Sequence, residues 1–88
     1  LTARRADALR ALAAELTAHG VAAHVVPADL SDPAAPAALF DAVAAKGLTV
    51  DVLVNNAGFG VYGPFVDADP TRLLEMVRVN VAAVVHLT

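Results

Sequence analysis

The chain has 88 residues and a mass of 9.0 kDa, which is the size of one small domain and excludes a two-domain enzyme. The hydrophobic share of 58% excludes intrinsic disorder, and a net charge of -3 argues against binding to the phosphates of nucleic acid. The absence of cysteine excludes disulfide bonds and thiolate metal sites.

Apolar periodicity predicts three helices that alternate with two strands. Leucines at helical spacing, closed by a glycine, predict the first helix over residues 6–19. A short stretch rich in valine predicts a buried strand at residues 21–27, and a second helix follows at 34–46. The β-branched run at 50–54 is typical of a central parallel strand. A long third helix is predicted over residues 69–88.

Two proline-containing turns predict where helices begin. Ser31 and Asp32 precede Pro33, so we expect Ser31 to cap the second helix and the proline to occupy its first position. Asp69 and Pro70 repeat this arrangement before the third helix. We therefore interpret Ser31, the only serine, as a cap rather than a nucleophile.

Strands that alternate with helices predict an α/β fold with right-handed crossovers. We therefore expect a parallel sheet with helices on its faces. The longest apolar stretch, residues 76–88, contains polar residues and is shorter than the ~20 residues of a membrane span. No targeting segment is visible, so we expect a cytoplasmic protein without membrane contact.

Polar residues follow the predicted strands, at the sheet edge where open parallel sheets bind ligands. They are Arg4-Arg5, Asp29-Leu30 and the loop Asn55-Asn56-Ala57-Gly58. The glycine lets a ligand approach the backbone closely, and the two amides offer donors and acceptors without charge. This combination suits a neutral sugar or the edge of a base.

The run Val52-Leu53-Val54-Asn55-Asn56-Ala57-Gly58 resembles the strand-4 signature of the short-chain dehydrogenase/reductase family, and the resemblance extends along the whole chain. It implies an α/β fold, as part of a Rossmann-like, doubly wound parallel sheet in an incomplete three-layer αβα arrangement. It also implies an NAD(P)-dependent oxidoreductase that acts on a carbonyl or alcohol substrate. By this resemblance Asn56 ties neighbouring strands together, and the cofactor ribose is lined by Asn55, Ala57 and Gly58.

Two further positions match the family. Asp29, with Leu30, sits where the family binds the adenine ring, and Asn80 matches its catalytic asparagine, which helps hold a water in a proton relay. Asn80 also stands out without the family, because it shares a helical stripe with apolar residues expected to be buried, and a buried amide needs partners. The alternative is a core asparagine with a purely structural role. The stripe consists of Leu73, Met76, Val77, Val84 and Leu87.

Arg4 and Arg5 bear on the choice of cofactor. In the resembled family an acidic residue at the end of the second strand pairs with the ribose of NAD, whereas arginine offers a fork to the 2′-phosphate of NADP. We therefore expect NADP(H), bound mainly by Arg4 and less by Arg5, with NAD(H) still possible. The alternative is that both arginines are solvated charges before a helix.

The tyrosine and the histidines give weaker evidence for a catalytic or metal-binding role. Tyr62 lacks the lysine that follows the family's catalytic tyrosine four positions later, where this chain has Val66. We expect Tyr62 to border the substrate pocket with Phe59 and Phe65, or simply to pack. The three histidines lack the spacing of metal ligands, so no metal site is expected.

The resemblance implies that residues 1–88 are an internal segment of one NAD(P)-binding domain, from the end of strand 2 through the asparagine-bearing helix. The family's glycine-rich turn, serine and tyrosine-lysine pair are absent here, so the segment alone is expected to be inactive. A non-catalytic dinucleotide sensor or scaffold is the alternative function. The apolar residues Val79, Val81 and Val85 on the third helix suggest a homo-oligomer at full length.

Overall fold

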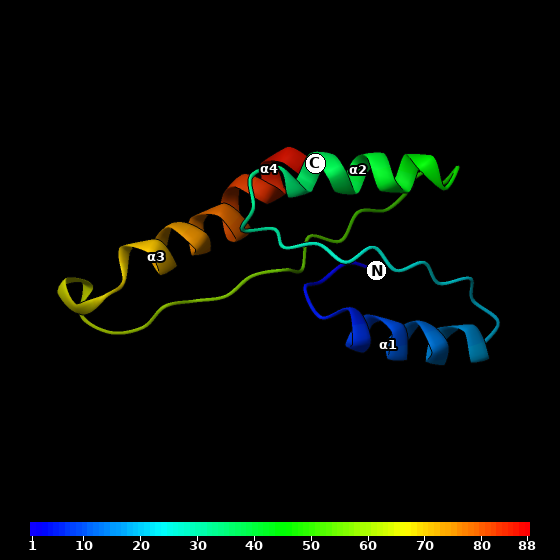
Figure 1. Ribbon diagram of the computed structural model, residues 1–88, viewed down its shortest axis with the longest axis horizontal. Helices are drawn as coiled ribbons and strands as arrows, with labels where there is room; N and C mark the ends of the chain where they lie inside the picture. The colour runs from blue at the N-terminus through cyan, green and yellow to red at the C-terminus, as the bar shows by residue number, and fades with distance from the viewer.

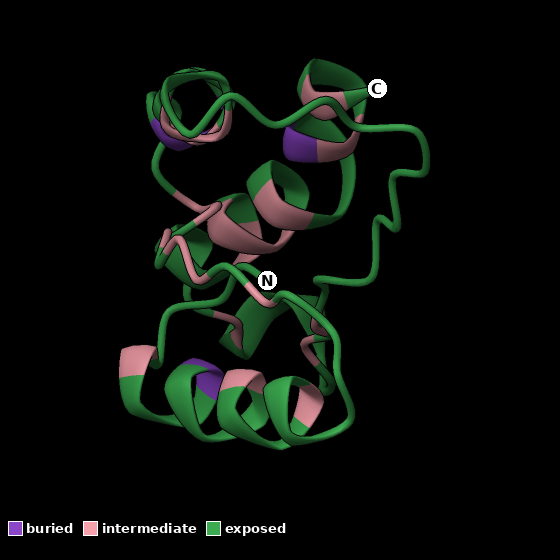
Figure 2. Ribbon diagram, turned by 90° about the vertical axis from the view of Figure 1, so that its right-hand side faces the viewer, coloured by how far each residue is buried: buried purple, intermediate pink, exposed green.

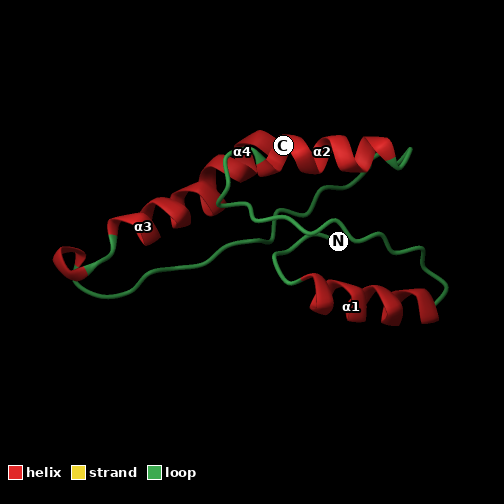
Figure 3. Ribbon diagram, in the orientation of Figure 1, coloured by secondary structure: helices red, strands yellow, loops and turns green.

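The computed structural model describes all 88 residues and consists of helices joined by extended segments (Figure 3). The helical elements are α1 (Ala6–Ala18), α2 (Ala35–Ala45), the 3-10 turn η1 (Phe65–Asp67), α3 (Pro70–Val77), the π-helical segment η2 (Arg78–Ala82) and α4 (Ala83–Leu87). The three predicted helices are confirmed to within one residue at each end. The third helix consists of α3, η2 and α4, which follow one another without a break.

No β-strand forms, so the strands predicted at 21–27 and 50–54 are wrong for this structure and the parallel sheet is not confirmed. A helix pairs its backbone groups within its own segment, whereas a strand needs a neighbour. Residues 50–54 have no such neighbour, since their only backbone hydrogen bond is the local one from Asn56 N to Val54 O. Val52 and Val54 are 80% and 77% exposed. A β-branched run favours a strand but cannot supply its partner.

The first residues of the chain do run alongside a later segment in parallel. Leu1 N donates to His24 O at 2.8 Å, Val26 N donates to Leu1 O at 3.0 Å, and Ala28 N to Ala3 O at 3.1 Å. The pairing advances by two residues on both segments in the same direction, which is the register of a parallel ladder. These few hydrogen bonds do not make a regular β-strand, but they place residues 1–3 beside residues 24–28.

Extended chain lies between two groups of helices. α1 lies on one side and α2 with α4 on the other, as two perpendicular views show (Figures 1 and 2). α2 packs along α4, and α1 contacts no other helix. The helices therefore occupy the outer layers of the expected three-layer fold, while its middle layer lacks a sheet.

The chain buries little of its surface. Only four of the 88 residues are buried: Pro36, and Leu9, Ala35 and Ala83, which expose 7%, 9% and 3% of their surface. The accessible surface of 6438 Å² exceeds by about 1,600 Å² the surface of a compact protein of this mass. The radius of gyration is 15.0 Å, against about 12 Å for a compact domain of this length. Much of the apolar composition therefore lacks a packing partner.

This exposure predicts how the 88 residues behave alone. We expect them to associate, or to unfold without a cooperative transition, because the exposed run at 50–54 has unpaired backbone groups on both sides. Light scattering over a concentration series and circular dichroism on heating measure both properties. Val52→Lys should reduce association, since a charge on an open strand edge opposes pairing. A monomer with a cooperative thermal transition would contradict the expectation.

The helix caps agree with the sequence at one helix and differ at another. Asp69 caps α3 as predicted: its carboxylate accepts from Thr71 N at 2.9 Å, with Pro70 at the first helical position. The predicted Ser31 cap of α2 is wrong, because α2 begins later, after Ala34, and has no side-chain cap. Asp32 instead accepts from Ala34 N at 2.9 Å and closes the turn before the helix.

Candidate functional site

The structure brings Arg4 and Asp29 together. Both line a hollow of about 360 Å³, together with Pro27 and Ala28. They meet because the parallel pairing of residues 1–3 with 24–28 carries the two chain segments to the same end. Arg5, in contrast, is the N-terminal flanking residue of α1 and makes no side-chain cap.

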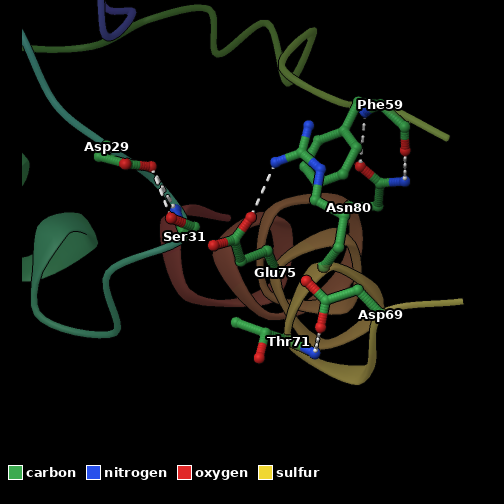
Figure 4. A network of polar contacts seen from close by, with 8 residues as sticks. Asp29, Ser31, Phe59, Asp69, Thr71, Glu75 and Asn80 are labelled. Carbon is green, nitrogen blue, oxygen red and sulfur yellow. Dashed lines mark hydrogen bonds and ion pairs between the residues drawn. The ribbon is translucent and has the colours of Figure 1, made fainter. Parts of the chain in front are cut away.

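The Asp29 side chain is organised by its own turn (Figure 4). Its Oδ1 accepts from Ser31 Oγ at 2.7 Å and from Ser31 N at 3.0 Å. These hydrogen bonds hold the pKa of the Asp29 carboxyl below its usual range, and the nearby Arg4 guanidinium acts more weakly in the same direction. Asp29 is therefore a carboxylate at neutral pH, with Oδ2 available to accept a hydrogen bond. Ser31, expected as a helix cap, serves here to orient this carboxylate.

Asn80 holds the loop that follows the 50–54 run (Figure 4). Its Nδ2 donates to Phe59 O at 2.8 Å, and its Oδ1 accepts from Phe59 N at 3.1 Å. One amide thus satisfies both main-chain groups of a single residue, 21 positions away in sequence. The two motifs that sequence analysis singled out separately, the Asn55–Gly58 loop and Asn80, are joined in space through Phe59.

The surroundings of Asn80 differ from the prediction in one respect. Asn80 lies in η2 and is exposed, as is Val77 of the stripe that was expected to be buried. The stripe was expected to pack against a sheet, and no sheet forms in this structure, so Asn80 and Val77 remain exposed. Its amide partners are main-chain groups of a loop, not the interior of a core.

The glycine of the loop lies directly against this amide. A Cβ at Gly58 would come within 3.1 Å of Asn80 Oδ1, a tighter approach than side chains ordinarily make. The sequence predicted Gly58 as a place of close approach to a ligand, and the structure shows a close approach to Asn80. Glycine here keeps the Asn80 amide in register with Phe59.

The remaining predicted residues lie apart from these two groups. Asn55 Nδ2 donates to Thr88 Oγ1 at 3.1 Å, and none of residues 55–58 lines the hollow beside Arg4. The expected tie from Asn56 to a neighbouring strand is not formed, because no strand is present. Tyr62 is 97% exposed, so it does not pack. Ala57 is also exposed, and Leu30 is partly exposed without lining the hollow.

Sequence analysis missed one contact at this site. The guanidinium of Arg72 lies 3.9 Å from the centre of the Phe59 ring. Phe59 was expected at a substrate entrance, and no local pattern links it to an arginine 13 positions later. A clue was present only in the three-residue spacing of Arg72 and Glu75, which predicts an ion pair on one helix face.

The structure contains no cluster of three or more His, Cys, Asp or Glu side chains placed to hold a metal ion. Nor does any helix combine the length and apolar character that crossing a membrane requires.

Comparison with known proteins assigns the family. The family model for short chain dehydrogenases matches residues 1–88. The chain belongs to the short-chain dehydrogenase family. A short-chain dehydrogenase/reductase of Macrophomina phaseolina is 40% identical over 78 residues, which is 86% of this chain and 45% of that protein. A probable oxidoreductase of Mycobacterium tuberculosis is 36% identical over 74 residues, covering 84% of this chain and 12% of that protein.

Solved dehydrogenases share the fold of this short-chain dehydrogenase segment. A structure from a study of 7beta-hydroxysteroid dehydrogenase stereoselectivity matches with a TM-score of 0.88 and 30% identity, over 98% of this chain and 34% of the other. A gluconate 5-dehydrogenase from Burkholderia cenocepacia, solved with NADP and tartrate, matches with a TM-score of 0.82 and 28% identity. The match covers 99% of this chain and 34% of the other. The likeness supports a Rossmann-like fold, and the chain spans less than half the length of these relatives.

Gly58 provides a test of the loop contact. We expect Gly58→Ala to lower the free energy of unfolding by about 1–2 kcal/mol, because the added methyl displaces Asn80 and weakens two hydrogen bonds. Urea denaturation measures the change. Gly60→Ala is the matched control, since its Cβ would meet only the Tyr62 ring, at 3.4 Å. Equal effects of the two substitutions would contradict the role given to Gly58.

Proposed function

We propose that residues 1–88 are an internal segment of one NAD(P)-binding domain, in an enzyme that transfers hydride between NADP(H) and a carbonyl or alcohol carbon. Membership of the short-chain dehydrogenase family supports the reaction class. The observation that carries the proposal is the pair of hydrogen bonds by which Asn80 holds Phe59, directly after the Asn55–Gly58 loop. Two segments that match the family's functional motifs thereby form one unit.

The pairing of Arg4 with Asp29 at one hollow supports a dinucleotide as the ligand. Arg4 lines a hollow large enough for a phosphate, and the ordered carboxylate of Asp29 lies beside it. In the proposed site Arg4 binds the 2′-phosphate of NADP, with Arg5 contributing less, and Asp29 accepts a hydrogen bond from the adenine amino group while Leu30 packs nearby. The presence of NADP in the related gluconate 5-dehydrogenase supports this choice over NAD.

The loop and Asn80 have separate tasks in this proposal. NADP(H) supplies or accepts the hydride when bound. The main chain at Ala57 and Gly58, with Asn55, lines the ribose, and Asn80 fixes the position of that main chain. Asn80 also helps to hold the water of a proton relay. The full-length protein is expected to act on a small molecule as a cytoplasmic homo-oligomer.

The test uses the full-length protein. Binding of NADPH and NADH is measured by fluorescence titration, and turnover is followed by NADPH absorbance with a panel of ketones and secondary alcohols. We expect preferential binding of NADPH and turnover of at least one substrate class, whereas the 88 residues alone should show none. Binding without turnover across the panel would favour the alternative, a dinucleotide sensor or scaffold. No binding of either cofactor would overturn both.

A further inference from the structure

Phe59 is held by its side chain as well as by its main chain. The Arg72 guanidinium lies 3.9 Å from the ring centre, which is within the range of a cation–π interaction. Arg72 Nη1 also donates to Glu75 Oε2 at 2.8 Å. The guanidinium therefore contacts both the carboxylate of Glu75 and the ring of Phe59, two side chains that Figure 4 labels. We call these three side chains the Phe59 clasp.

The helix geometry makes this contact specific. Arg72 and Glu75 are three residues apart on α3, so they share a face, and their ion pair fixes the direction of the long arginine side chain. An exposed ion pair contributes little stability by itself, and the two side chains here are 44% and 32% exposed. Its contribution is orientation, because a guanidinium already bound to Glu75 loses little freedom when the ring lies against it.

Phe59 differs from the other aromatic residues near it. It is partly buried, whereas Tyr62 and Phe65 are 97% and 80% exposed. Hydrogen bonds to Asn80 in η2 hold its main chain, and Arg72 in α3 holds its ring. A segment fixed at two points on one helix can neither slide along that helix nor turn about a single contact. The residues just before it, Asn55–Gly58, are positioned by the same two points.

We propose that Arg72 is a positioning residue that acts through Phe59 to set the Asn55–Gly58 loop against its ligand. The proposal rests on the proposed function in naming NADP(H) as that ligand. The charge of Arg72, and not only its aliphatic stem, is required, because the ring face attracts a cation. Phe59 is correspondingly part of the support for the loop and not of an open substrate entrance.

The test compares Arg72→Met with Arg72→Lys in the full-length protein, with Arg10→Met as a control at an exposed position of α1. Two quantities are measured: the dissociation constant for NADPH, and the hydrogen-exchange rate of the Phe59 amide, whose partner is Asn80 Oδ1. We expect Arg72→Met to raise the dissociation constant and the exchange rate about fivefold each. Arg72→Lys keeps the positive charge and should return both quantities most of the way to their wild-type values. Arg10→Met should change neither quantity. Amides of α1 should exchange at the wild-type rate throughout, which separates a local effect from general destabilisation.

A double-mutant comparison completes the test. Phe59→Leu should weaken NADPH binding to a similar extent. The double variant with Arg72→Met should have the same dissociation constant as Phe59→Leu alone, because the two side chains act as one unit. Additive effects, or full function in Arg72→Met, would overturn the proposal. If the wild-type protein binds no dinucleotide, the proposed function fails, and the Phe59 amide still reports separately whether the Phe59 clasp holds the loop.

Discussion

Replacement of Asn80 by leucine is expected to lower kcat/KM of the full-length enzyme about a hundredfold. The substitution keeps the shape of the side chain but leaves Phe59 N and Phe59 O without their partners. A hydrogen bond contributes about 0.5–1.5 kcal/mol net, and ~2.7 kcal/mol, near the upper end for the two bonds together, corresponds to a factor of about 100. Steady-state kinetics with NADPH measures the change. The proposed loss of the relay water adds to it.

Asn80→Asp separates the two hydrogen bonds. The new carboxyl still accepts from Phe59 N, but as a carboxylate it faces Phe59 O with no proton to donate. The carboxylate oxygen and the Phe59 carbonyl oxygen repel each other, whereas the protonated carboxyl restores the donor to Phe59 O. We therefore expect the stability of Asn80→Asp relative to wild type to be greater at low pH than at neutral pH.

Urea denaturation at several pH values, with wild type measured in parallel, checks that direction. Val81→Ala in the same π-helical segment is the control, because Val81 is 56% exposed and should change little. A wild-type kcat/KM in Asn80→Leu, or a stability difference in Asn80→Asp that does not vary with pH, would contradict the role derived for the amide.

Arg4→Asp is expected to reduce the preference of the full-length enzyme for NADPH over NADH about a hundredfold. The substitution removes a charge-assisted hydrogen bond to the 2′-phosphate, worth about 1.5–3 kcal/mol, and places a carboxylate near that phosphate. NADH has no phosphate at this position, so its binding should hold steady or improve. The ratio of kcat/KM for the two cofactors is the measurement.

Two matched substitutions sharpen that result. Arg5→Asp changes the neighbouring charge without altering a residue of the hollow and should have the smaller effect, since Arg5 does not line it. Arg10→Asp makes the same charge change on α1 and should leave the preference intact. If Arg4→Asp leaves the cofactor preference unchanged, the arginines are solvated charges and Arg4 has no part in recognition.

The helices could be predicted because their signals are local. Leucine spacing and the Asp69-Pro70 start lie within a few residues of the bonds they produce, and α1 and α3 follow them closely. The strands could not be predicted in the same way, because a strand at residues 50–54 requires hydrogen bonds to another extended segment, and no such segment pairs with these residues. The cap of α2 failed for a different reason: Ser31 had a competing acceptor, Asp29, two residues away.

The sequence named residues of the candidate site one by one but did not predict how they contact one another. The Asn55–Gly58 loop and Asn80 were both identified from sequence, but their connection runs through the main chain of Phe59, which carries no sequence signal. The π-helical turn that carries Asn80 could not be predicted, because the apolar spacing was compared only with the 3.6-residue period of an α-helix. The partnership of Arg72 with Phe59 joins two residues whose types, taken singly, indicate a surface charge and a pocket wall.

The bare valine-rich segment at 50–54 has a consequence for biogenesis. Such a window, with high β propensity and a single charge, is the kind that nucleates amyloid-like stacking when it emerges unshielded from a ribosome. Asp51 is the one acidic side chain inside the run, and a charge at such a position opposes stacking of identical segments. A chaperone that binds extended apolar segments would therefore find its target in this window.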